Sequence, residues 1–84
     1  PFEFQEVCFE MAALDEIQYG FEADRPVEFD IHYHEGFTIH FIVELSGITV
    51  NADKFVAEVG RSYCLRWANE SLTRTSLTYL IIGP

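Results

Sequence analysis

Three histidines lie close together in the middle of the chain and are the residues best suited to chemistry. His32, His34 and His40 occupy the stretch EFDIHYHEGFTIHFIVEL with the spacing H-x-H-x5-H, and Asp30 precedes them. Imidazole and carboxylate groups are common ligands of zinc and copper. The same polar residues alternate with apolar ones, which is typical of a half-buried strand with one wet face. A metal site and an ordinary polar sheet face are therefore the two alternatives, and we favour the polar face.

Alternation of apolar and polar residues predicts that strands position these histidines. Turn-forming residues separate the alternating segments, and the one helical candidate, residues 10–16, is too short to form a stable helix. Eight short strands in one chain of 84 residues predict an all-β fold. The expected strands are 2–10, 16–23, 27–33, 37–45, 47–50, 54–59, 62–68 and 74–82.

These segments predict a compact antiparallel β-sandwich of about seven to eight strands, jelly-roll-like in outline. A chain of this length has room for a single domain, residues 1–84. The chain starts abruptly at Pro1 and ends at Pro84, which favours a processed chain or a fragment of a longer one. A two-sheet fold of this size offers little concavity for a substrate pocket.

The loop of the central hairpin decides which side chains share a face. A two-residue loop at Glu35-Gly36 would mix apolar and polar residues on both faces. A three-residue loop, 34–36, gathers the apolar residues on one face and puts Gly36 at the last, left-handed position. We therefore predict the three-residue loop, with His34 in the turn. The predicted cross-strand pairs are Tyr33–Phe37, Ile31–Ile39, Phe29–Phe41, Asp30–His40 and His32–Thr38.

This register places Asp30, His32 and His40 on the outer face, within reach of His34. The metal alternative would use all four residues as ligands of zinc or copper. Parallel side chains on a flat sheet do not converge on one point, and no histidine follows residue 40 to close the shell. We therefore predict that the histidines hold no metal. We also predict that His32→Ala changes stability by less than about 0.5 kcal/mol, whereas Phe41→Ala costs about 3–5 kcal/mol.

The charge balance excludes several classes of partner. The chain has 14 acidic and 5 basic residues, a net charge of −9, so it has no basic surface for nucleic acid or an anionic membrane. No apolar run approaches the ~18 residues of a membrane span. The sequence contains neither a glycine-rich phosphate loop nor a G-x-S-x-G motif. We predict no enzyme, no cofactor, and a protein as the partner.

The two cysteines have two alternatives. Cys8 and Cys64 can bridge to each other or remain two buried thiols. A bridge would join segments 56 residues apart and stabilise the fold by about 4 kcal/mol on the loop-entropy model. It would also require an oxidising compartment, such as a secretory lumen, a periplasm or the extracellular space. Without a bridge, the sequence names no compartment.

Three phrases carry a family resemblance: VCFEM near the start, FDIHYHEG in the middle, and GRSYCLRWANES with LTYLI near the end. Together they resemble the Golgi-dynamics (GOLD) β-sandwich of vesicle cargo receptors and small uncharacterised GOLD-like proteins. The resemblance implies a disulfide between Cys8, in Cys8-Phe9-Glu10, and Cys64, which follows Gly60 and Tyr63 with a looser spacing than in the family. It also implies a non-catalytic interaction module, and it supplies no catalytic residue.

Trp67 is the remaining candidate for binding. It shares a strand face with Tyr63 and Leu65, which predicts a place in the core or at its rim, whereas an exposed tryptophan would be a binding anchor. The sequence as a whole predicts a binding or structural module that contributes to protein–protein contacts, such as a small accessory subunit of a larger assembly. The alternative function is a zinc- or copper-binding protein that uses the histidine cluster.

Overall fold

The structure, a computed structural model, describes residues 3–69 and 73–83 and is all-β in that part of the chain. Every pairing among the described strands is antiparallel, which confirms the all-β, antiparallel part of the predicted fold. No helix with the length and apolar composition needed to cross a membrane occurs among these residues. The five strands are β1 (Glu3–Met11), β2 (Glu16–Glu35), β3 (Thr38–Val56), β4 (Arg61–Asn69) and β5 (Leu77–Ile82).

The number of strands is smaller than the predicted seven to eight because β2 and β3 are long. The predicted segments 16–23 and 27–33 are one strand. Likewise, β3 begins within the predicted segment 37–45, runs through 47–50 and ends within 54–59. Pro26 lies where β2 changes register against β3, a stretch in which a missing N–H is tolerated. Gly47, with φ +64°, sits in a bulge of β3 instead of a turn. Most of the connection between the predicted strands 62–68 and 74–82 lies outside the described residues.

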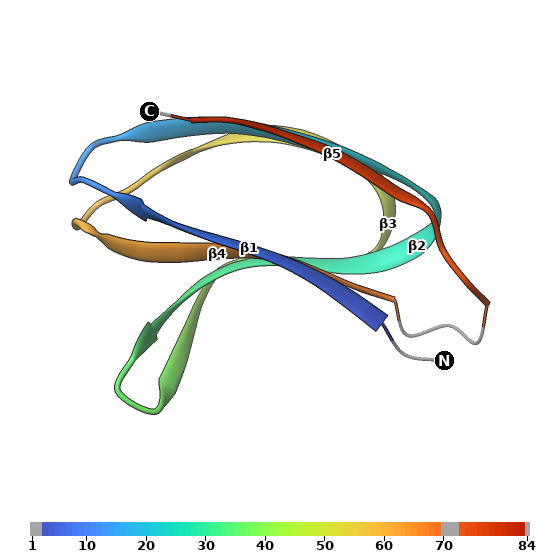
Figure 1. Cartoon of the computed structure of the whole chain (residues 1–84), viewed down its shortest axis with the longest axis horizontal. Coiled ribbons are helices and arrows are strands. Elements are labelled where there is room, and N and C mark those ends of the chain that lie inside the picture. Colours follow the sequence, from blue (N-terminus) through green and yellow to red (C-terminus); the bar gives the residue numbers. More distant parts are fainter. Residues whose placement is uncertain (1–2, 70–72, 84) are drawn as a thin grey trace.

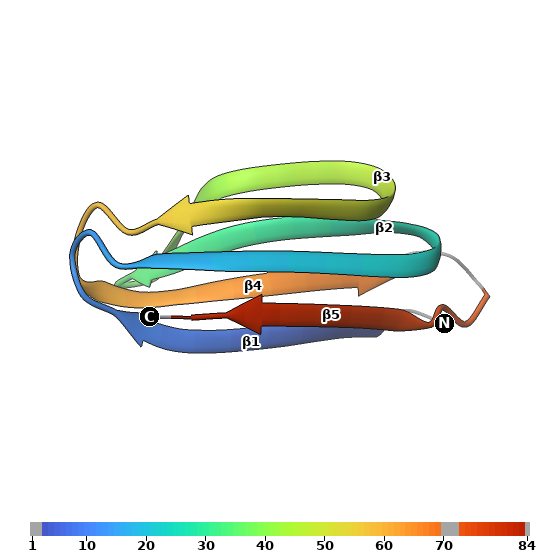
Figure 2. The same ribbon diagram turned by 90° about the horizontal axis from the view of Figure 1, so that it is seen from above.

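The bends in β2 and β3 fold one sheet over itself. The strand order is β1-β4-β2-β3, and β5 pairs with the first half of β2. In Figure 1, the first half of β2, β5 and the end of β3 form one layer, which faces β1, β4 and the second half of β2. Figure 2 shows the same strands from above, with β3 along one side. Two separate packed sheets therefore remain a prediction, whereas the described strands form one continuous sheet.

An aromatic cluster fills the space between the two layers. The ring of Phe29 lies 4.8 Å from Phe21 and 5.4 Å from Trp67, between ring centroids. Trp67 is 2% exposed, which confirms its predicted place in the core, and it stacks on Tyr79 at 4.7 Å. Burying one large apolar side chain contributes roughly 1.5–3 kcal/mol, so this cluster is a main source of stability. The largest fully buried side chains are Trp67, Phe29, Ile17, Ile31 and Leu65.

The register predicted for the β2–β3 hairpin is wrong. The loop has two residues, Gly36 and Phe37, and Gly36 with φ +62° occupies the first position, as in a type II′ turn. A further irregularity leaves Ile42 unpaired between two ladder positions. The observed cross-strand pairs are Glu35–Thr38, His34–Ile39, Tyr33–His40, His32–Phe41, Ile31–Val43, Asp30–Glu44 and Phe29–Leu45.

The new register follows from where the hairpin lies. It projects beyond the two layers in Figure 1, so no second layer covers either of its faces. The predicted register gave Phe37, Ile39 and Phe41 the same apolar face as Phe29 and Ile31. Phe29 and Ile31 are buried, whereas the other three are exposed. The rule that apolar residues share the covered face therefore holds for the base of the hairpin and fails at its tip.

Candidate functional site

A cross-strand disulfide lies at the centre of a polar cluster on the outer face of the sheet. Cys8 of β1 faces Cys64 of β4, with Cα atoms 4.1 Å apart, and the two sulfurs are bonded. This confirms the bridge between the two cysteines. Because side chains two positions apart share a strand face, Glu6 and Arg66 lie on the same outer face as the bridge.

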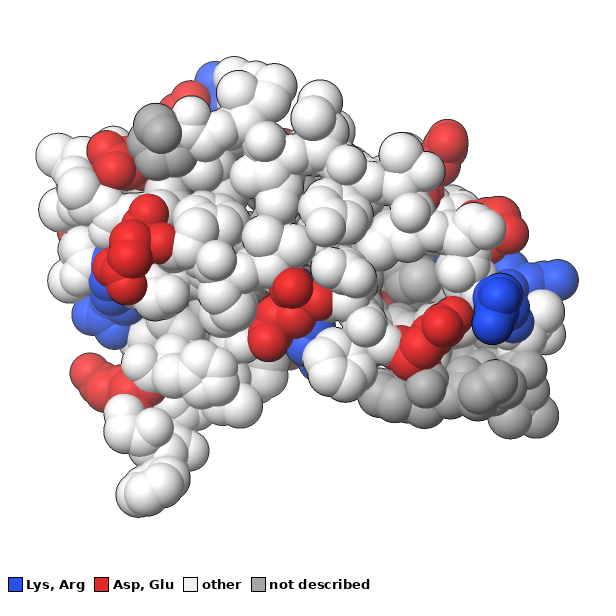
Figure 3. Space-filling model, in the orientation of Figure 1, with Lys and Arg blue, Asp and Glu red and all other residues white. Residues whose placement is uncertain are grey.

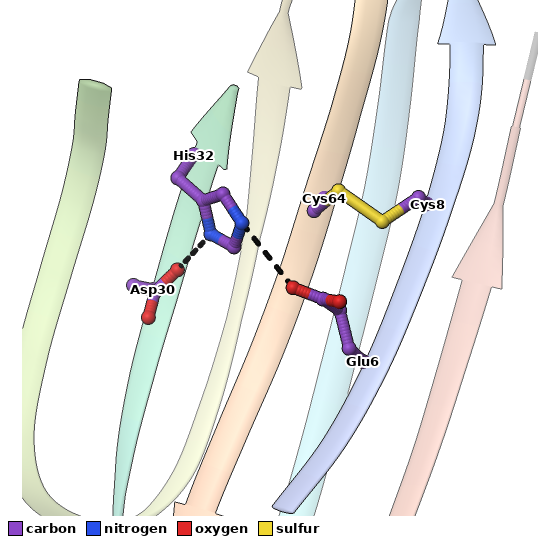
Figure 4. Close-up of a disulfide and its surroundings, with 5 residues drawn as sticks. All are labelled: Glu6, Cys8, Asp30, His32 and Cys64. Carbon is purple, nitrogen blue, oxygen red and sulfur yellow. Dashed lines mark hydrogen bonds and ion pairs between the residues drawn. A yellow bond between two sulfur atoms is a disulfide. The ribbon is translucent and has the colours of Figure 1, made fainter. Parts of the chain in front are cut away.

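Strand pairing arranges these side chains in two neighbouring rows. Cys8, Cys64 and His32 are successive partners across β1, β4 and β2. Glu6, Arg66 and Asp30 are successive partners two residues further along the same strands. Figure 4 shows the imidazole of His32 lying between Asp30 and Glu6, beside the disulfide. Residues far apart in the sequence therefore meet at one place because three strands are in register.

A chain of polar contacts connects the two rows. Arg66 Nε donates a hydrogen bond of 3.0 Å to Asp30 Oδ2, and Asp30 Oδ1 lies 2.5 Å from His32 Nδ1. On the other side of the ring, His32 Nε2 lies 3.2 Å from Glu6 Oε2. His32 is 3% exposed and Asp30 is 6% exposed. Both residues were predicted on the wet outer face, and both are buried. A neutral imidazole carries a single N–H and donates to only one of these two carboxylates.

The other two histidines have different surroundings. The rings of His34 and His32 lie 5.2 Å apart, so β2 brings these two residues together. His34 is exposed and belongs to β2, not to the turn. His40 stacks on Tyr33 at 4.8 Å, and its Nε2 lies 3.2 Å from Glu35 Oε1. The predicted Asp30–His40 pair is therefore wrong, because the two-residue loop and the bulge at Ile42 shift the register of β3.

Two groups of possible metal ligands occur among the described residues, and both include cysteine. One contains His32, His34 and Cys64, and the other contains Glu6, Cys8 and Cys64; within each, the donor atoms lie within 4.8 Å of one another. The ligand set of the metal alternative, Asp30 with all three histidines, is not one of them. In the disulfide form, the sulfur atoms of both groups are bonded to each other and are not available as thiolate ligands.

A second feature is the free edge of β3. Among the described residues β3 pairs with β2 alone, so its other side is a sheet edge along all 19 residues. Both halves of β3 border an open groove of about 720 Å³ next to the start of β4. The large apolar residues exposed on this strand are Ile39, Phe41, Ile42, Val50 and Val56.

The remaining site predictions have clear outcomes. Trp67 is buried, so it does not present the exposed indole that the binding alternative assumed. Glu6 and Arg66 were missed, although either could have been found from the cysteine pairing, since each lies two residues from a bridged cysteine. The β3 edge was missed because edge position depends on the order of the strands, which local sequence does not encode.

Comparison with known proteins identifies no relative of this chain. No protein-family model matches the chain, and a search of curated proteins returns no significant match. The GOLD resemblance of the three sequence phrases therefore stays a prediction.

Proposed function

We propose that this chain is a non-catalytic interaction module that binds an extended segment of another protein along the free edge of β3. The single observation that carries the proposal is the length and composition of that edge. A row of unpaired backbone N–H and C=O groups is a template for an added strand, and natural proteins protect such edges with charges, proline or a covering element. β3 contains no proline and only three charged residues, Glu44, Asp53 and Lys54.

The groove beside β3 supplies pockets for the side chains of an added strand. Strand addition takes affinity from main-chain hydrogen bonds and specificity from alternate side chains that enter pockets. Ile42 is 44% exposed and Val56 is 46% exposed, and both line the groove. Val59, from the β3–β4 connection, adds a further exposed apolar side chain. Contiguous exposed apolar surface of this kind is typical of binding sites.

Charge defines the chemistry of the partner. The chain carries a net charge of −9, which favours a basic partner. At the site itself the charges balance, since the groove is lined by Glu58 and Arg61, and Asp53 and Lys54 are both exposed on β3. In Figure 3, acidic side chains are scattered over the visible face, and the projecting hairpin is uncharged at its tip. A segment that alternates apolar and basic residues fits both properties. A second copy of the same chain would bring a second charge of −9, which disfavours self-pairing.

The disulfide and the sequence resemblance agree with this role. On this proposal the two layers are a β-sandwich of the GOLD type, and the bridge between Cys8 and Cys64 is the one that the resemblance implies. A bridged chain would work in an oxidising compartment, which means a secretory lumen, a periplasm or the extracellular space. A role as an accessory subunit follows, since the chain would contribute an edge to a larger assembly.

The experiment uses a short synthetic peptide of alternating lysine and valine with blocked ends, called the Lys-Val probe. Calorimetry should show saturable binding of the Lys-Val probe to the oxidised chain. Ile42→Lys and Val50→Lys place a charge on the β3 edge and should each weaken binding by about tenfold, which corresponds to about 1.4 kcal/mol. Leu80→Lys on β5 is the matched control, because Leu80 is 65% exposed and Val50 is 63% exposed.

The control separates edge binding from general attraction between opposite charges. All three variants change the net charge equally, so a purely electrostatic effect would weaken binding equally in all of them. A version of the probe with proline at its centre should bind poorly, because proline cannot complete a strand ladder. Equal losses for Leu80→Lys and Val50→Lys, or self-association of the chain in sedimentation, would contradict the proposal.

A further inference from the structure

The residues around the disulfide form a ligand set that becomes complete only when the bridge is reduced. The bridge joins Cys8 and Cys64, and the donor atoms of His32 and His34 lie within 4.8 Å of each other and of the Cys64 sulfur. Two thiolates and two imidazoles are a common ligand set of structural zinc. We infer that the reduced form of this protein binds one zinc ion through Cys8, Cys64, His32 and His34.

The strand pairing would hold the two cysteines together after the bridge opens. β1 and β4 pair continuously from Glu3–Asn69 to Met11–Arg61, and the Cys8–Cys64 pair lies inside this ladder. Their backbones therefore stay fixed by neighbouring pairs on both sides. His32 is the next partner of Cys64 across the sheet, so three of the four ligands come from one row of adjacent strands. The donor atoms of His32, His34 and Cys64 already lie within 4.8 Å of one another, and the fourth ligand, Cys8, is the ladder partner of Cys64.

A carboxylate already orients the buried histidine in the way that metal sites require. Histidine ligands usually donate their second ring N–H to a carboxylate, which fixes the tautomer and the ring orientation. Asp30 contacts Nδ1 of His32 and is itself held by Arg66. This leaves Nε2 directed toward Glu6 and the disulfide, as Figure 4 shows. A metal ion would then replace Glu6 as the partner of Nε2.

The chemical step is a two-electron reduction. A dithiol reductant attacks the disulfide, its two sulfurs become a disulfide, and two electrons and two protons pass to the cysteines. Cys8 is exposed on β1, so one side of the bridge is accessible to such a reductant. Zinc then displaces the two thiol protons and binds the thiolates. The disulfide form lacks thiolates, so metal binding reports the redox state of the surroundings.

The test compares the oxidised and reduced chain with cobalt(II) as a spectroscopic stand-in for zinc. A phosphine reduces the bridge without supplying competing thiols. The reduced chain should take up one cobalt per chain and show the strong visible bands of a tetrahedral thiolate complex, which zinc should remove. The oxidised chain should show no such bands. Equal binding by both forms would overturn the inference.

Variants identify the ligands. His32→Ala and His34→Ala should each abolish stoichiometric binding, and Asp30→Asn should weaken it by roughly 10–100-fold through loss of ring orientation. His40→Ala is the matched control, because His40 stacks on Tyr33 outside the ligand set. It should leave the affinity unchanged. A loss in His40→Ala equal to that in His32→Ala would mean that the reduced chain binds metal without the predicted site.

Folding is monitored in the same experiment. Reduction removes the constraint of the bridge, and Trp67 fluorescence with circular dichroism reports whether the reduced chain stays folded. If the metal-free reduced chain unfolds, zinc should restore the native spectra, because binding to a folded site stabilises the fold. Failure of zinc to restore them, or a folded reduced chain that binds no cobalt, would overturn the inference.

Discussion

His32→Ala should destabilise the fold more than Phe41→Ala, which is the reverse of the order predicted from the sequence. His32→Ala removes a ring that is 3% exposed and leaves Asp30 without its bond to Nδ1. A hydrogen bond that involves a charged group contributes about 1.5–3 kcal/mol, and the half-exposed Glu6 pair adds less than about 1 kcal/mol. The expected loss is therefore about 3 kcal/mol. Phe41 is 49% exposed, so Phe41→Ala should cost about 1 kcal/mol, roughly half of a fully buried ring.

Urea titration of the oxidised variants measures both losses on one scale. A shift of the midpoint with an unchanged slope reports stability itself and not a change in the unfolded state. His40→Ala is the control for removing a histidine, and because His40 is partly exposed its loss should stay below about 1 kcal/mol. A larger loss in Phe41→Ala than in His32→Ala would show that the cluster around Asp30 does not stabilise the fold as described.

Three further predictions test the bridge, a buried tyrosine and the core. Replacing both Cys8 and Cys64 by serine should lower the free energy of unfolding by about 4 kcal/mol in guanidinium titrations, because the bridge closes a loop of 56 residues. An unchanged free energy of unfolding would contradict a stabilising role of the bridge. Burial, with repulsion from Asp53 in addition, raises the pKa of Tyr19 above 10.0. The stability that the protonated Tyr19 contributes should therefore be fully present below pH 10 and be lost as the pH rises through the folded-state pKa. Tyr19→Phe should remove this part of the alkaline decline, and an unchanged decline would refute the assignment. Trp67→Ala should cost about 3–5 kcal/mol in urea titrations, and a loss below about 1 kcal/mol would place Trp67 outside the core.

Local sequence pattern was sufficient for the strands and insufficient for their bends. Alternation located segments that belong to every observed strand, because each strand has one face toward the core. It could not show that Asp24 and Arg25 stay extended, since their short polar run before Pro26 looks like a turn. The chain bends there because β2 passes from one layer to the other, and that bend depends on pairing with β4 and β5.

The polar cluster was only partly predictable for a similar reason. Asp30 and His32 were identified as candidates, but their contacts with Glu6 of β1 and Arg66 of β4 join residues that are distant in the sequence. Glu6 reaches His32 because the pairing of β1 with β4 places it opposite Arg66, on the same outer face as His32. His40 was placed on the wrong face because a single bulge at Ile42 reverses the faces of β3.

The measurement that tests the binding proposal most directly is nuclear magnetic resonance of the isotope-labelled, oxidised chain with the Lys-Val probe. If the probe adds a strand, backbone amide signals should shift along β3, from Thr38 to Val56, and the edge amides there should exchange more slowly with solvent. Signals from β1 and β5 should stay in place. Shifts along β1 or β5 with an unperturbed β3, or no change at saturating probe, would contradict the assignment of β3 as the partner-binding edge.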